Sequence, residues 1–410
     1  MRKYRSKVIK FLSGLLLATV LISQSASVQA EADTNSQASI TESQTIKVKV
    51  DDKTINFDIS PYITNERTMV PVRAPMEALG CAVTWNPIKK QAIIIRGSTI
   101  VKFTIGSTSY TVNDQMRQMD TAPEITNGRA AFPIRYAVEA VGGKVAWDAD
   151  TQTIGIISPV AQKRNGMSPL ELINKTEQAE KSANTYQSKE INNSKYRTLI
   201  FINGESKNEE ENQQEIAEKM VQSDPFISYS SIKKSDGTSE ETVNTQNAKY
   251  VKSANNEWAK TSDTSDQDLL DNRQIIANGV MNGLVFEEDA LIDGKDCWVM
   301  SSPLNSQTLK IMQQRFEKSL LRGDTSNKDL QKFIDQEINN FTNSGYIKLW
   351  IDKETNLCIH EYMYVSASTC ASIQNQQTNK SLEMSFDGEF TLDVQNYNFG
   401  APVHFPDYEK

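Results

Sequence analysis

The chain has 410 residues, a formal net charge of −8 at pH 7 and only two histidines, His360 and His404. This acidity argues against a nucleic-acid partner, because polyanions attract clusters of Lys and Arg. Copper and catalytic zinc sites usually take two or three imidazoles, and two histidines in the whole chain make such a site unexpected. We also expect no other metal and no organic cofactor.

The first 30 residues predict a cleaved secretory signal. A basic segment, Met1 to Lys10, precedes the apolar run Phe11 to Ile22, and Val28-Gln29-Ala30 offers the small residues that a signal peptidase needs. The run is shorter than the roughly 20 apolar residues that span a bilayer. We expect a secreted or cell wall-associated mature chain without a transmembrane helix; an uncleaved anchor is the alternative. Residues 31–45 are a polar linker.

Residues 46–158 contain one pattern twice, at a constant offset of 62. The segment Pro61 to Arg73 recurs as Pro123 to Arg135, and the match continues without a gap to the two tryptophans. Such a repeat indicates two copies of one supersecondary unit packed as one domain.

Each copy predicts strands, a turn, a short helix and a hairpin. The turns fall at Asn65-Glu66 and Asn127-Gly128, and a proline is expected in the first turn of each helix. On each helix an arginine and a glutamate lie four residues apart, and a glycine caps the end of the helix. A tryptophan lies at the start of the strand that follows. We expect the two tryptophans to be buried in equivalent places. We assign these residues a structural role rather than a ligand patch: Arg73, Glu77, Gly80, Trp85, Arg135, Glu139, Gly142 and Trp147.

These motifs resemble the copper amine oxidase N-terminal-like domain, also called the stalk domain of bacterial surface proteins. The resemblance covers 46–158, and the first copy departs from the pattern at Cys81 and Asn86. It implies an α+β module of antiparallel strands and short helices, found outside cells and fused to varied partners. It does not imply oxidase activity, since that chemistry needs three histidine ligands and a cofactor-forming tyrosine in a separate catalytic domain.

The four cysteines do not follow the spacing of a disulfide scaffold, so we expect free thiols. Cys358 and Cys370 would be roughly 40 Å apart in one continuous strand. Cys358 and His360 would share a strand face, which we interpret as an ordinary face rather than a fragment of a metal site.

A second domain is expected at 168–410, after a linker at 159–167. Ser168, Pro169 and Glu171 predict a helix that starts with a capping box. Strand-like segments then dominate, which indicates a large antiparallel curved sheet covered by helices. The acidic run Glu205 to Glu215 is interpreted as solvated faces or loops.

A helical insertion is predicted at 306–341, with an apolar stripe on each of two helices. It would cover the sheet or act as a mobile lid over a cavity. The candidate residues that line an apolar ligand are Leu309, Met312, Phe316, Leu320, Ile334 and Ile338.

The order of elements in 168–410 resembles the lipoprotein-carrier superfamily typified by LolA and LppX. The segments that carry this are Asn256 to Lys260, Asp293 to Trp298 and Leu349 to Lys353. The resemblance implies a possible apolar pocket rather than a catalytic site.

No glycine-rich phosphate loop, HExxH helix, Gly-x-Ser-x-Gly elbow or zinc cysteine cluster occurs in the sequence. We therefore expect a non-enzymatic envelope protein. Its stalk would serve display or attachment to a cell-wall or surface component, and its C-terminal domain would serve recognition. The alternative is an extracytoplasmic carrier or sensor of a lipid or other apolar small molecule.

Overall fold

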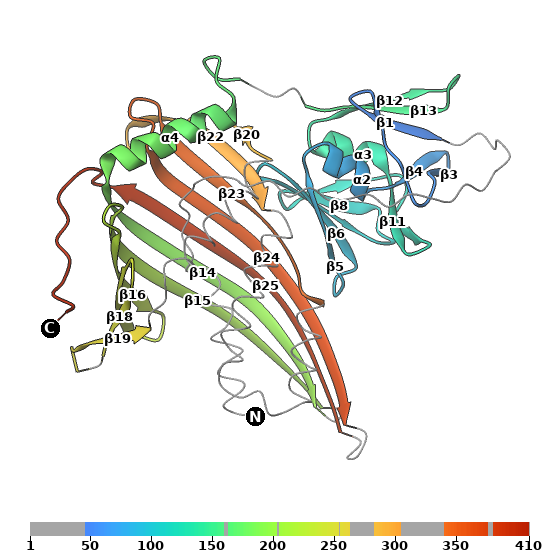
Figure 1. The fold of residues 1–410 in the computed structure, drawn as a ribbon. Coiled ribbons are helices and arrows are strands. Elements are labelled where there is room, and N and C mark those ends of the chain that lie inside the picture. The colour runs from blue at the N-terminus through green and yellow to red at the C-terminus, as the bar shows by residue number, and fades with distance from the viewer. Residues whose placement is uncertain are drawn as a thin grey trace, which may run out of the picture. The chain divides into compact units, whose positions relative to one another are not determined.

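The computed structural model describes residues 46–159, 163–202, 205–253, 255–262, 283–304, 340–375 and 380–409 (Figure 1). The chain divides into two compact units between residues 161 and 162. The predicted signal peptide, the linker at 31–45 and the insertion at 306–341, apart from its last two residues, lie outside the described residues.

The N-terminal unit contains three sheets with strand orders β12-β13-β1-β2, β10-β11-β4-β3 and β5-β6-β7-β8-β9 in the part of the chain described. All neighbouring strands in it are antiparallel except β1 and β13, which pair in parallel. Its elements are β1 (Lys47–Val50), β2 (Lys53–Thr54), β3 (Tyr62–Thr64), β4 (Arg67–Pro71), α2 (Arg73–Ala78), β5 (Ala82–Asn86), β6 (Gln91–Arg96), β7 (Thr99–Thr104), β8 (Ser109–Val112), β9 (Gln115–Gln118), β10 (Glu124–Thr126), β11 (Arg129–Pro133), α3 (Ile134–Ala140), β12 (Lys144–Asp148) and β13 (Thr153–Ile157).

The two copies of the repeated pattern pair reciprocally in the middle sheet. Val70 of β4 lies opposite Phe132 of β11, its counterpart at the offset of 62. Two ion pairs exchange partners in the same way: Arg67 donates to Asp120 and Arg129 donates to Asp58, over 2.6 and 2.8 Å. The contacts between the copies therefore follow a local two-fold relation centred on Val70 and Phe132.

The predicted turn residues adopt the expected backbone conformations. Asn65 and Glu66 have φ of 46° and 61°, and Asn127 and Gly128 have 49° and 77°, as a tight hairpin turn with two left-handed residues requires. Gly142 follows α3 with φ of 84°, which confirms its role as a C-terminal cap, and Gly80 does the same after α2.

The predicted place of the prolines is wrong. Pro71 ends β4 and Pro133 ends β11, and the helices begin after them, at Arg73 and Ile134. A missing N–H is harmless at the last residue of a strand as well as in the first helical turn, so the sequence pattern fits both places.

The tryptophans keep equivalent register positions but differ in exposure, which corrects the expectation that both are buried. Trp85 lies opposite Ala92, and Trp147 lies opposite Ile154, the counterpart of Ala92. Trp85 packs against the hydrophobic core, whereas Trp147 is 42% exposed. We attribute the difference to the facing residue, because small Ala92 leaves space over the core that the larger Ile154 fills.

Trp85→Ala should therefore destabilise the N-terminal unit more than Trp147→Ala. We expect a loss of about 2 kcal/mol for Trp85 and less than about 1 kcal/mol for Trp147, because only the first change removes packed surface. Denaturant unfolding of the two variants measures both values. Equal losses would show that the packing difference between the copies is not real.

The C-terminal unit is one helix and a 12-stranded antiparallel sheet, in the part of the chain described, which confirms the predicted large antiparallel sheet. Its order is β19-β18-β17-β16-β15-β14-β25-β24-β23-β22-β20, with β21 also paired to β22. The elements are α4 (Pro169–Ala183), β14 (Thr185–Ile202), β15 (Glu205–Gln222), β16 (Ile227–Lys234), β17 (Ser239–Thr245), β18 (Lys249–Lys252), β19 (Trp258–Ser262), β20 (Val285–Phe286), β21 (Ala290–Ile292), β22 (Lys295–Leu304), β23 (Thr342–Asp352), β24 (Cys358–Asn375) and β25 (Lys380–Tyr397).

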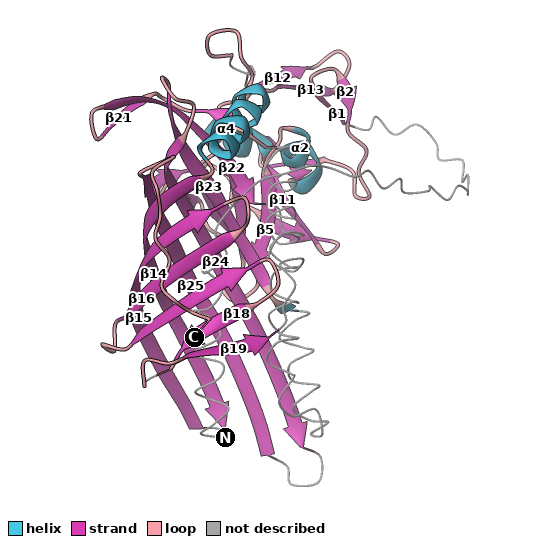
Figure 2. Cartoon of the chain, turned by 60° about the vertical axis from the view of Figure 1, so that its left-hand side comes forward, coloured by secondary structure: helices cyan, strands magenta, loops and turns pink. Residues whose placement is uncertain are grey.

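Helix α4 begins as predicted. The Ser168 hydroxyl accepts a hydrogen bond from the Glu171 amide, and the Glu171 carboxylate accepts one from the Ser168 amide. Figure 1 shows α4 across one end of the long strands, and Figure 2 shows how far strands outnumber helices in the described part of this unit.

The interpretation of Glu205 to Glu215 as solvated faces or loops is right about a solvated face and wrong about a loop, because Glu210, Asn212 and Gln214 are exposed on one side of a strand. These residues belong to β15, an 18-residue strand paired along its whole length with β14. The segment is poor in β-branched and aromatic residues, so its own sequence gives little strand preference. Hydrogen bonding to β14 on one side and β16 on the other decides its conformation.

Candidate functional site

One face of the long sheet, here called the inner face, is buried over six strands. Residues directly opposite in antiparallel neighbours share a face, so the register identifies its members. On β22 to β25 most of them are apolar, with Ser302 and Glu361 among the exceptions. The apolar members form what we call the apolar patch: Met300, Ile347, Leu349, Met363, Val365, Phe386, Phe390, Leu392 and Val394, all at most 8% exposed.

The inner face changes character at β14. The residues that continue it there and on β15 form what we call the polar strip: Ser188, Glu190, Asn192, Ser194, Thr198, Glu211, Gln213 and Glu215. Asn192 lies opposite Leu392 of the apolar patch on one side and opposite Glu215 on the other. One sheet therefore presents an apolar and a polar half on a single buried face.

Some members of the polar strip have partners on the same face. Tyr196 donates its hydroxyl proton to Glu211 over 2.6 Å, and Gln213 donates to the same carboxylate oxygen over 2.8 Å. Glu190, which is 1% exposed, forms an ion pair with Lys219 at 2.8 Å. These contacts hold in place the side chains that surround Asn192 and Glu215.

A pair of carboxyl groups lies at one end of the inner face. Burial and the charge of Glu361 together raise the pKa of Glu180, on α4, to about 8. Burial likewise raises the pKa of Glu361, on β24, to about 7, although Asn396 donates a hydrogen bond to it over 3.0 Å. At neutral pH this end of the face therefore holds a proton that an exposed carboxyl would have lost.

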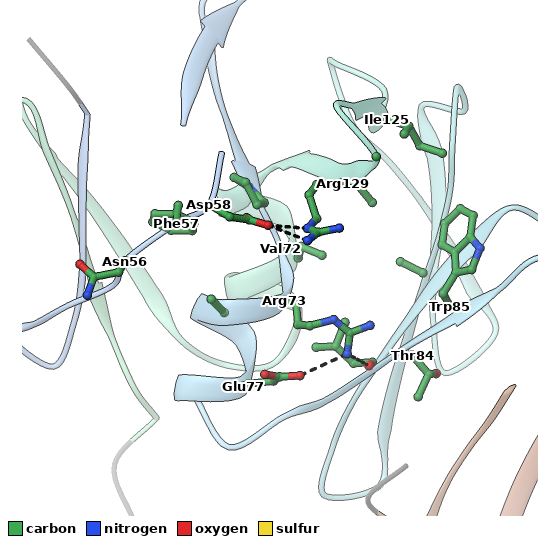
Figure 3. Close-up of a pocket in the computed structure, with 16 residues that line it drawn as sticks. Asn56, Phe57, Asp58, Val72, Arg73, Glu77, Thr84, Trp85, Ile125 and Arg129 are labelled. Atoms are coloured by element: carbon green, nitrogen blue, oxygen red, sulfur yellow. Dashed lines mark hydrogen bonds and ion pairs between the residues drawn. The ribbon is translucent and has the colours of Figure 1, made fainter. Parts of the chain in front are cut away.

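A separate cleft of about 690 Å³ lies in the N-terminal unit (Figure 3). Phe57, Val72 and Val83 contribute apolar surface, and Trp85 lies across the cleft from the charged residues. Arg129 pairs with Asp58, while Arg73 pairs with Glu77 at 3.2 Å and donates to the Val83 carbonyl oxygen over 2.8 Å. Both arginines thus have partners within the unit.

The predicted repeat residues do not gather symmetrically. Arg73, Glu77 and Trp85 line the cleft together. Trp147 lines a different cleft, which Lys47 and Lys49 also line. Arg135 and Glu139 are both exposed on α3, and no ion pair between them is found in the described part of the chain. The candidate ligand-lining residues lie outside the described residues: Leu309, Met312, Phe316, Leu320, Ile334 and Ile338.

Two thiols are held in their protonated form, and His360 is engaged by its neighbours. Burial raises the pKa of Cys81 to about 12 and that of Cys358 well above its usual range, so both stay protonated and poorly nucleophilic. His360 stacks on Trp350 with ring centroids 4.4 Å apart and shares a hydrogen bond with Asp393. Across the described ranges, no three His, Cys, Asp or Glu side chains group as metal ligands would.

Sequence reasoning missed Asn192 and Glu215. The pattern Ser188, Glu190, Asn192, Ser194 alternates at the period of a strand, but the intervening residues are also largely polar. Hydrophobic alternation therefore could not show which side of β14 is buried. Strand β25 has a clear apolar side, and its pairing with β14 shows which side of β14 is buried.

One protein-family model matches part of the chain. Residues 49–156 match the model of the copper amine oxidase N-terminal domain, which confirms the resemblance predicted for 46–158. The match covers that N-terminal domain and not the catalytic domain of copper amine oxidase. No curated protein sequence matches the chain.

Solved structures resemble the chain only distantly. They include lipoprotein LppX of Mycobacterium tuberculosis (13% identity, TM-score 0.31) and LprF of Mycobacterium bovis (13%, 0.29). A DUF1329 family protein of Desulfovibrio piger has 12% identity and a TM-score of 0.21. Each match covers 58% of this chain and 97% of the other. The predicted resemblance to the carrier superfamily thus recurs, at scores that support no functional conclusion.

Among the residues that the structure describes, no helix has both the length and the apolar composition needed to cross a membrane.

Proposed function

We propose that this protein works outside the cytoplasm, without catalysis, and that its C-terminal sheet takes up an apolar or amphipathic molecule. The N-terminal unit would serve attachment or display, and its export would depend on the signal at residues 1–30. A plain recognition domain, which holds no small molecule, is the competing function.

The proposal rests on the length of the inner face compared with that of helix α4, which covers one end of it. Strands β14, β15, β24 and β25 have 18 residues each, which corresponds to about 60 Å. Helix α4 has 15 residues, or about 22 Å, and contributes Leu172 and Ile173 to the core. A face this long and this apolar must be covered, and an apolar ligand beneath the predicted lid at 306–341 would form part of that cover.

The test is to purify the full chain from cells that export it, extract it with organic solvent and identify released molecules by mass spectrometry. A fluorescent fatty acid then reports on binding. Met363→Asp, which places a charge in the apolar patch, should weaken probe binding by at least about tenfold, because a charge is costly on apolar surface.

The matched control is Tyr362→Asp, one residue earlier on β24. Its side chain points to the opposite face, so probe binding should stay within about twofold of the parent. Circular dichroism verifies that both variants keep the sheet. A clean extract together with no probe binding by the parent would leave the recognition domain as the surviving function.

A further inference from the structure

Asn192 is the most unusual polar residue of the inner face. It is 5% exposed, and neither its amide nitrogen nor its amide oxygen has a hydrogen-bond partner in the described part of the chain. A buried amide without partners is costly, so natural proteins rarely keep one without a reason.

Glu215 repeats this feature on the neighbouring strand. It is 8% exposed, and its Oε2 is buried without a partner within the described ranges. Directly opposite residues on paired strands have Cβ atoms about 5 Å apart, so the two unsatisfied groups adjoin. Together they offer one donor, Asn192 Nδ2, and two acceptors, Asn192 Oδ1 and Glu215 Oε2.

The charges around these groups favour a cation. Glu211 lies on the same face of β15 as Glu215. The two lysines nearby are each paired already: Lys219 with Glu190, and Lys234, directly opposite Glu215 on β16, with Glu240. Burial raises the pKa of Glu215 and the charge of Lys234 offsets this only in part, so a cation bound at Oε2 would stabilise the carboxylate further. An anionic headgroup would be repelled here.

We propose that Asn192 and Glu215 form a subsite for the amine-bearing headgroup of an amphipathic ligand. The inference rests on the proposed function, because the apolar part of the same ligand would lie on the apolar patch, which starts at Leu392, next to Asn192. The ammonium donates to Glu215 Oε2 and Asn192 Oδ1, and Asn192 Nδ2 donates to an adjacent ligand oxygen.

Three probes with the same twelve-carbon chain test this: dodecylamine, 1-dodecanol and dodecanoic acid, titrated into the full chain at neutral pH below their aggregation concentrations. Dodecylamine should bind at least about tenfold more tightly than dodecanoic acid, since a buried charge-assisted hydrogen bond contributes that much. Glu215→Gln should remove most of this advantage and leave 1-dodecanol binding unchanged.

Two further variants make the test specific. Glu218→Gln changes an exposed carboxylate on the same strand and should leave all three affinities unchanged. Asn192→Leu should raise Tm, because it removes the unsatisfied buried amide, while it weakens dodecylamine binding. Such a gain in stability with a loss of affinity is expected of a binding residue and not of a structural one.

The outcomes separate the two proposals. If none of the three probes binds, the apolar-ligand function itself fails. If all bind with similar affinity, if dodecanoic acid binds best, or if Glu215→Gln leaves dodecylamine affinity unchanged, the sheet binds apolar molecules but the amine subsite is wrong.

Discussion

Replacing Phe132 by alanine should lower the free energy of unfolding of the N-terminal unit by about 3–5 kcal/mol, the range for truncation of a large buried aromatic side chain. Phe132 is fully buried at the centre of the local two-fold relation, opposite Val70. Its ring meets that of Phe103 edge to face, with centroids 5.2 Å apart. The cavity left by alanine would therefore open between the two copies, where neither can close it alone.

Hydrogen exchange followed over residues 46–159 measures this loss without interference from the C-terminal sheet. Met116→Ala is the control, because Met116 is 73% exposed on β9 and its truncation should cost less than about 0.5 kcal/mol. Similar effects of the two substitutions would contradict the position of Phe132 in a shared core.

Lowering the pH from about 8 to about 5 should stabilise the C-terminal unit by roughly 3 kcal/mol or more, from the raised pKa values of Glu180 and Glu361. These groups ordinarily titrate near 4.5, whereas in the folded unit their pKa values are about 8 and about 7. Between those limits the folded state binds more protons than the unfolded state, so stability rises as the pH falls. The gain is complete once the pH approaches 4.5.

Other groups around the pair support the same direction. Glu177 on α4 and Glu190 on β14 add negative charge that favours the protonated forms, and Lys219 opposes them only in part. Cys358 lies near enough to both carboxyl groups for their charges to act on its thiol, whose high pKa keeps it neutral over this range.

Urea unfolding at several pH values measures the effect. Glu180→Gln should remove a large part of the pH dependence and stabilise the unit at pH 8, where the parent must bury a charge. Glu383→Gln, at an exposed position on β25, should keep the parental slope. A stability that falls from pH 8 to pH 5 would contradict the raised pKa values of Glu180 and Glu361.

Local signals in the sequence predicted much of the N-terminal unit and the start of the second. The turn at Asn127-Gly128, the caps Gly80 and Gly142 and the capping box at Ser168 each depend on residues within a few positions of one another. Backbone conformation and hydrogen bonding over such short distances follow from residue type, so these predictions needed no knowledge of the fold.

The sequence by itself thus determined the offset repeat, its family resemblance and a large antiparallel sheet. Only the tertiary structure decided that Glu205 to Glu215 lies within a strand, that Trp147 is exposed while Trp85 packs, and that Asn192 faces Glu215. Each of these depends on what pairs across the sheet. The identity of a cross-strand neighbour depends on register between distant segments, which the polar pattern of β14 and β15 leaves open.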